Sequence, residues 1–234
     1  MELNNINYKN LFTTTKDNNI LLYDKLNENY FDFIYVHIPK NGGTTIRYKL
    51  KQIKDCLIIS NPNELQTHRS MININHTIYK NYLYPEKLIT FVREPLKRCI
   101  SMFFFHKLHK KFNDFNDFID IIYNNKETYN YITNTEVIYN EQKPKLLSTP
   151  KGTNIAFSWK NQSYWLPDNI FFIGKLENLE DDIKKLCSKI NYNYKKIKVH
   201  SNKNNYKINL DDITSETKYK IYKLYETDYK RFNY

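Results

Sequence analysis

Apolar runs that alternate with helical periodicity are the main pattern along the chain. Residues 31–38 and 87–92 are nearly continuous apolar runs, which is typical of strands covered on both faces. Residues 169–173 predict a third strand. Helices are expected over residues 44–53, from a cap at Asn178 through about Ile190, and from about Ser215 to the C-terminus. Because strands alternate with helices, the pattern predicts an α/β fold around a mainly parallel sheet.

Length and composition suit one folded domain. The chain has 234 residues, of which 16% are aromatic, and this content excludes a disordered chain. Residues 1–30 are expected to form a loosely packed leader, and residues 31–234 a single domain. No apolar stretch approaches the roughly 20 residues that cross a bilayer, and the charged start lacks a signal-peptide core. We therefore expect a soluble, cytoplasmic protein.

The chain is basic, with 36 Lys and Arg against 25 Asp and Glu and a formal net charge of +11. Such a surface favours polyanions, including nucleic acids, acidic glycans and nucleotides, but the charge does not choose among them. The cysteines Cys56, Cys99 and Cys187 are far apart and form no CxxC pair. Their pattern favours free thiols over a disulfide framework or a zinc site, and we expect no metal.

The segment after the first strand has the composition of an anion-binding loop. Two adjacent glycines let backbone N–H groups converge on one anion, and the following helix adds the positive end of its dipole. A lysine charge and two threonine hydroxyls complete the set, which is Pro39, Lys40, Asn41, Gly42, Gly43, Thr44 and Thr45. Lys40 precedes the glycines, so this is not a Walker loop. The loop alone leaves open a tight turn whose glycines only relieve strain.

A second candidate anion site follows the strand at residues 87–92. Arg93 ends that strand and can present a planar guanidinium to a phosphate. Pro95 suits the first turn of a helix, and Arg98 and Ser101 share one face of that helix. Alone, this segment is an ordinary helix start. Two anion sites at neighbouring strand ends would suit a ligand with a phosphate at each end.

These segments resemble the two signatures of sulfotransferases that use 3'-phosphoadenosine 5'-phosphosulfate (PAPS). The loop PKNGGTT is similar to the family's PKTGGT/S loop, and the segment from Arg93 to Ser101 is similar to its Arg-Asp-Pro-x-x-Arg-x-x-Ser element. Asn41 replaces the usual Thr or Ser, which puts one phosphosulfate contact in doubt. Glu94 replaces the usual Asp, a mild departure.

Further segments extend the resemblance over about residues 31–234. Residues 172–182 are similar to a strand-turn-helix stretch of the family, residues 225–234 to its C-terminal ending, and residues 162–165 to a segment near its acceptor. We expect the first two to be structural, because Leu224, Tyr225, Tyr229 and Phe232 share one helical stripe. The resemblance is strongest to the carbohydrate sulfotransferases of the heparan 2-O and chondroitin 4-O type. It implies a three-layer, P-loop-like sulfotransferase fold.

The resemblance also implies roles for individual residues. Residues 39–45, Arg93 and Ser101 would bind PAPS, Lys40 would stabilise the oxygen that leaves sulfur, and no metal would be needed. The acceptor would be a hydroxyl, most plausibly of a glycan. Relatives place a catalytic histidine in a stretch comparable to the one around His76, and a neutral imidazole suits proton abstraction near pH 7.

The assignment of the base leaves alternatives. His76 could instead be a hydrogen-bonded structural histidine; His68 is the second candidate and Glu64 the third. His37 is expected to pack beside the loop. His200 lies in a polar stretch that relatives use to cover the nucleotide.

Other functions remain to be weighed against sulfuryl transfer. A kinase-like phosphotransferase would need a Walker lysine, which this chain lacks. A non-enzymatic basic module for nucleic acid lacks a recognition signature, so no nucleic-acid partner is expected. A degenerate sulfotransferase that binds donor without transfer is disfavoured by the presence of Lys40 and Arg93.

Overall fold

Two compact units make up the part of the chain that the computed structural model describes, which is residues 33–50, 53, 56–58, 88–136, 142–166, 168–194 and 208–234. The sheet unit takes its described residues from Met1–Phe91, Leu166–Gly174 and Asn178–His200. The helical unit takes them from Val92–Trp165, Lys175–Glu177 and Ser201–Tyr234. The predicted leader at residues 1–30 lies outside the described residues, and the single domain over residues 31–234 stays a prediction.

The sheet has the strand order β2-β1-β3-β4. Its strands are β1 (Phe33–Val36), β2 (Cys56–Ile58), β3 (Leu88–Val92) and β4 (Phe172–Lys175). β1 runs parallel to β2 and to β3, with Tyr35 paired with Ile58 on one side and with Ile89 on the other. All of β3 is buried. The predicted α/β class with a mainly parallel sheet flanked by helices is therefore confirmed.

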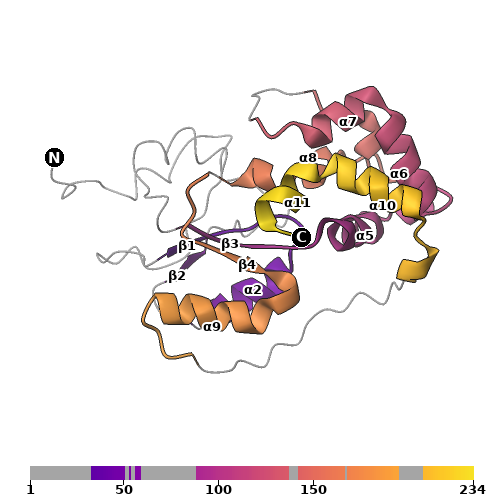
Figure 1. Ribbon diagram of the computed structural model, residues 1–234. Helices are drawn as coiled ribbons and strands as arrows, with labels where there is room; N and C mark the ends of the chain where they lie inside the picture. The colour runs from indigo at the N-terminus through magenta and orange to yellow at the C-terminus, as the bar shows by residue number, and fades with distance from the viewer. Residues whose placement is uncertain are drawn as a thin grey trace. The chain divides into compact units, whose positions relative to one another are not determined.

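Two helices of the sheet unit, α2 (Gly43–Leu50) and α9 (Leu179–Lys189), lie side by side (Figure 1). Lys49 of α2 is 4% exposed and its Nζ lies 2.6 Å from Oε2 of Glu180 on α9. Glu180 also accepts a hydrogen bond from the Tyr194 hydroxyl. Because a buried ammonium is costly without a partner, this ion pair ties α2 to α9 in one arrangement.

The helical unit has a hydrophobic core of its own. Phe103, Phe118 and Trp159 are buried at its centre, where aromatic rings pack edge to face or tilted against one another. Its α-helices are α5 (Pro95–Phe105), α6 (Phe115–Asn124), α7 (Lys126–Thr133), α8 (Ala156–Trp159), α10 (Ser215–Leu224) and α11 (Glu226–Phe232). Its short 3₁₀ helices are η3 (Leu108–Lys110), η4 (Lys145–Leu147), η5 (Gln162–Trp165), η6 (Leu176–Asn178) and η7 (Leu210–Asp212). The last residue of η6, Asn178, is assigned to the sheet unit.

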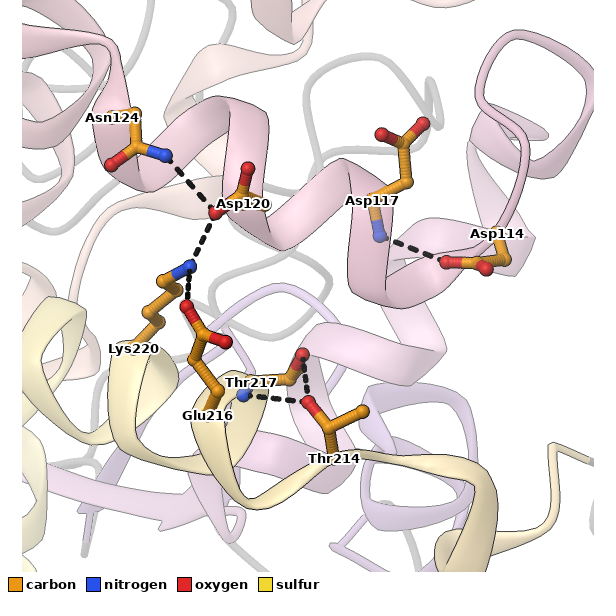
Figure 2. A network of polar contacts seen from close by, with 8 residues as sticks. All are labelled: Asp114, Asp117, Asp120, Asn124, Thr214, Glu216, Thr217 and Lys220. Atoms are coloured by element: carbon orange, nitrogen blue, oxygen red, sulfur yellow. Dashed lines mark hydrogen bonds and ion pairs between the residues drawn. The ribbon is translucent and has the colours of Figure 1, made fainter.

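Polar groups join α6 and α10 at their exposed edges (Figure 2). Asp114 and Thr214 each precede a helix and accept the backbone N–H three residues further on, at 2.8 and 3.0 Å. Lys220 of α10 bonds Asp120 of α6 and also pairs with Glu216 at 2.6 Å on its own helix. Such caps and ion pairs define where each helix begins and which face meets its neighbour.

The structure changes several expected element boundaries. β4 begins at Phe172 rather than residue 169, and Asn178 precedes α9 without a side-chain cap bond. The single helix expected from Ser215 is broken at Tyr225, which has φ −122° and ψ 25°. The Tyr225 hydroxyl is buried and donates to the Trp159 carbonyl at 2.9 Å. A tertiary contact therefore holds Tyr225, the residue between α10 and α11.

Candidate functional site

The loop between β1 and α2 belongs to the sheet unit. Lys40 and Gly42 both adopt left-handed backbone conformations, with φ values of 67° and 74°. A lysine rarely adopts this conformation, so the loop holds Lys40 in a defined and mildly strained state. α2 starts directly afterwards, with Ile46 donating to the Gly42 carbonyl at 3.0 Å. Lys40 and Thr45 are half-buried and Thr44 is exposed in the first turn.

Gly43 is required by a close approach of His37. A Cβ at residue 43 would lie 1.8 Å from Nε2 of His37, a distance that no side chain can occupy. His37 is buried, as expected for a residue packing beside the loop. Packing against His37 thus accounts for Gly43, and the left-handed backbone accounts for Gly42. The loop geometry that follows is a helix N-terminus beside a lysine, which is a suitable arrangement for an anion.

Asn41 ties this loop to the neighbouring strand. Its side chain is buried and its Nδ2 donates to the carbonyl of Phe91 in β3 at 2.9 Å. The residue that departs from the usual Thr or Ser therefore has a structural partner inside the sheet unit. Phe91 precedes Arg93 by two residues along the chain.

Arg93 follows β3 and lies in the helical unit. Its backbone N–H donates to Oε1 of Gln162 at 2.9 Å, and its carbonyl accepts from Nε2 of Gln162 at 2.8 Å. The side chain is half-buried. Burial lowers the pKa of Arg93, and the nearby carboxylates of Glu177 and Glu94 oppose that shift. The guanidinium is charged and only partly solvated, which strengthens its attraction for an anion.

Glu94 caps the helix that begins at Pro95. Its carboxylate accepts the N–H groups of Leu96 and Lys97 at 3.0 and 2.8 Å, and it accepts the hydroxyl of Tyr229 at 2.8 Å. Burial, together with the charge and hydrogen bond of Glu94, raises the pKa of Tyr229 far above its ordinary value. Glu94 therefore performs the capping that an aspartate would also supply.

Ser101 and Arg98 have different surroundings on α5. Ser101 is half-buried, whereas Arg98 is 1% exposed. Arg98 donates to the carbonyls of Ser158 and Lys160 at 2.7 and 3.0 Å. Its guanidinium holds the C-terminal end of α8, so Arg98 acts as a structural cation of the helical unit.

The predicted site residues therefore fall into two groups. Residues 39–45 form the end of the loop after β1 and the first turn of α2 in the sheet unit, and Arg93 and Ser101 lie in the helical unit. His76, the alternatives His68 and Glu64, and His200 all lie outside the described residues. The roles of all these residues stay predictions.

Comparison with known proteins decides the family. The sequence matches the model of the sulfotransferase family over residues 25–234, most of the chain. The chain belongs to the sulfotransferase family. A search of curated proteins and a search of solved structures each returned no match. The match confirms the resemblance to sulfotransferases as a family and indicates that the protein transfers sulfuryl groups.

Two buried polar residues of this sulfotransferase were not singled out by sequence reasoning. Asp228 of α11 accepts the backbone N–H groups of Gln162 and Ser163 at 2.7 and 2.8 Å. Lys160 is buried, with its Nζ 4.1 Å from the ring centre of Tyr131. The similarity of residues 162–165 to a family segment was a usable signal, but it did not indicate which residue Gln162 contacts.

The described part of the sulfotransferase also bears on metal binding and membrane insertion. No cluster of three or more His, Cys, Asp or Glu side chains there is arranged to hold a metal ion. Among the same residues, every helix is too short or too polar to span a bilayer.

Proposed function

We propose that this sulfotransferase moves the sulfuryl group of PAPS to a hydroxyl of a carbohydrate acceptor. The observation that carries the proposal is the loop after β1, where Lys40 lies in a left-handed conformation beside the N-terminus of α2. Family membership over residues 25–234 supports the reaction class. The carbohydrate acceptor rests on the resemblance to the heparan 2-O and chondroitin 4-O enzymes.

Residues 39–45 would bind the 5'-phosphosulfate. The α2 N-terminus attracts an anion through its dipole and its first N–H groups, and the Thr44 and Thr45 hydroxyls lie in that first turn. Arg93 and Ser101 would bind the 3'-phosphate. A guanidinium can donate two parallel hydrogen bonds to a phosphate, which distinguishes this donor from nucleotides that lack the 3' group.

Transfer needs a base, an in-line nucleophile and a stabilised leaving group. His76 takes the proton of the acceptor hydroxyl, and the acceptor oxygen forms a bond to sulfur as the bond from sulfur to the 5'-phosphate oxygen breaks. Lys40 stabilises the charge that develops on that leaving oxygen. The products are the sulfated acceptor and 3'-phosphoadenosine 5'-phosphate (PAP). As in phosphoryl transfer, positioning and electrostatics supply most of the rate.

Ligand-dependent thermal stability tests the donor. PAP at about a hundred times its dissociation constant should stabilise the protein by about 2.7 kcal/mol, a Tm increase of about 5–10 °C. AMP and ATP–magnesium should give smaller shifts, and Arg93→Ala should lose the PAP shift. An equal shift with ATP–magnesium would instead favour a phosphotransferase. Salt-sensitive binding of RNA or DNA without a PAP shift would favour a nucleic-acid module.

Acceptor transfer tests the rest of the proposal. Labelled sulfate should pass from PAPS to desulfated heparan or chondroitin chains, and His76→Ala should lose turnover while it keeps the PAP shift. Full turnover in the His76→Ala protein would overturn the assignment of that base. Transfer to a non-carbohydrate hydroxyl alone would overturn the acceptor class and leave the donor standing.

A further inference from the structure

The side-chain amide of Gln162 pairs with both backbone polar groups of one residue, Arg93. Oε1 accepts the Arg93 N–H at 2.9 Å, and Nε2 donates to the Arg93 carbonyl at 2.8 Å. Arg93 comes immediately after the last residue of β3, where the strand's regular hydrogen bonding ends. Since buried backbone groups need partners, the amide supplies there what a neighbouring strand supplies within the sheet. Gln162 itself is fully buried.

Asp228 holds Gln162 from the opposite side. Its Oδ2 accepts the Gln162 N–H at 2.7 Å, and its Oδ1 accepts the N–H and the hydroxyl of Ser163, both at 2.8 Å. The carboxylate is buried, and these three bonds, with the nearby charge of Arg98, offset part of its desolvation. A fully bonded buried carboxylate of this kind holds the backbone at residues 162 and 163 in one conformation.

The residue after Arg93 is held independently. The Glu94 N–H donates to Oε1 of Glu177 at 3.0 Å, and Oε2 of Glu177 accepts the hydroxyl of the C-terminal Tyr234 at 2.9 Å. Gln162 and Glu177 thus fix two consecutive residues after β3. Gln162 is the one of these two residues that bonds both backbone polar groups of the arginine itself.

We propose that Gln162 is a positioning residue for donor binding, holding the Arg93 backbone so that its guanidinium meets the 3'-phosphate in the orientation needed for two hydrogen bonds. This inference rests on the proposed function. Guanidinium recognition of phosphate depends on the planar geometry of the donors, so a displaced backbone weakens it even when the charge remains. Affinity is gained by holding the group in place before the ligand arrives.

Gln162→Met, which keeps side-chain size and removes both hydrogen bonds, is the first test. Calorimetry should show PAP binding about tenfold weaker, while AMP, which lacks the 3'-phosphate, binds as it does to wild type. In the Arg93→Ala background, Gln162→Met should cause no further loss of PAP affinity. The control is Asn161→Ala: this buried neighbour donates to the Ile132 carbonyl at 2.8 Å, and its loss should leave the ratio of PAP to AMP affinity unchanged.

A second variant covers the case in which Gln162→Met does not fold. Gln162→Glu keeps the acceptor for the Arg93 N–H, but when ionised it cannot donate to the Arg93 carbonyl. Protonation restores the donor. PAP affinity relative to wild type should therefore be low at neutral and higher pH and recover as the pH falls towards the pKa of the new carboxyl, which burial raises.

The outcomes separate the inference from the proposed function. If Arg93→Ala weakens PAP binding but Gln162→Met keeps the wild-type ratio of PAP to AMP affinity, the positioning role is wrong and the donor assignment stands. The role is also wrong if Gln162→Met lowers PAP affinity equally with and without Arg93, or if Gln162→Glu shows no pH-dependent recovery. If Arg93→Ala itself leaves PAP affinity unchanged, the proposed 3'-phosphate site is overturned, and this inference with it.

Discussion

The loop after β1 and the segment after β3 are built in different ways. The loop takes most of its shape from residues that are close in sequence: Gly43 accommodates His37, and Lys40 and Gly42 turn the chain into α2. Its bond from Asn41 to Phe91 is a contact with a distant residue. The segment after β3 depends on distant residues, because Gln162 bonds Arg93 across 69 positions and Tyr229 bonds Glu94 across 135. A local loop can be recognised as a motif, whereas a segment held by remote side chains must be seen folded.

Basic residues in and near these two segments also differ in their surroundings. Lys40 and Arg93 are half-buried in the segments that follow β1 and β3, whereas Arg98 is buried against carbonyls and Lys49 against a carboxylate. We therefore expect basic residues of the same kind to have separate tasks, with Lys40 and Arg93 in the proposed donor site and Arg98 and Lys49 in the packing of the protein. Variants that distinguish these tasks test the comparison.

The largest effect is expected at Lys40, the loop residue closest to the proposed chemistry. Lys40→Ala should lower kcat by about 10²–10³-fold, because it removes the charge that stabilises the leaving oxygen. PAP affinity should change less than kcat. Single-turnover transfer from PAPS measures the rate and calorimetry the affinity. Lys126→Ala, an exposed lysine on α7, is the matched control and should keep full activity. Unchanged turnover in Lys40→Ala would remove the loop from the chemistry.

Arg98→Ala should be the most destabilising change in the segment after β3. It leaves the Ser158 and Lys160 carbonyls without their donors and removes a positive charge near Asp228, so we expect a loss of about 3 kcal/mol in the free energy of unfolding. Urea denaturation measures it.

Arg93→Ala is the matched arginine variant for that experiment. It should lose PAP binding while it changes stability by less than about 1 kcal/mol. Equal destabilisation by the two substitutions would mean that Arg93 is also a structural cation, and the division of tasks would fail.

Gly43→Ala should cost about 2 kcal/mol of stability, a smaller effect that tests the local construction of the loop. The added Cβ would overlap the His37 ring, so either the ring or the start of α2 must move. The double variant Gly43→Ala with His37→Ala should recover part of that loss relative to His37→Ala alone. A double variant whose losses simply add would show that His37 does not explain the glycine.

Local patterns were enough for much of the fold. The continuous apolar runs predicted β1 and β3, and Pro95 predicted the first turn of α5, because these signals depend on neighbouring residues alone. The start of β4, by contrast, came three residues later than the apolar run suggested. The helices between residues 115 and 133 went unpredicted, although Phe115, Phe118 and Ile122 have helical spacing and are buried.

The sequence by itself determined the family, the α/β class and the loop with its lysine and glycine pair. Each of these depends on motifs or apolar runs whose residues are neighbours along the chain. Only the tertiary structure decided that Arg98 is structural, that Asn41 bonds Phe91, and that Gln162 clamps the Arg93 backbone. The physical reason is that a buried polar group must be bonded, but its partner can lie anywhere along the chain. Which partner it finds depends on packing between segments far apart in sequence.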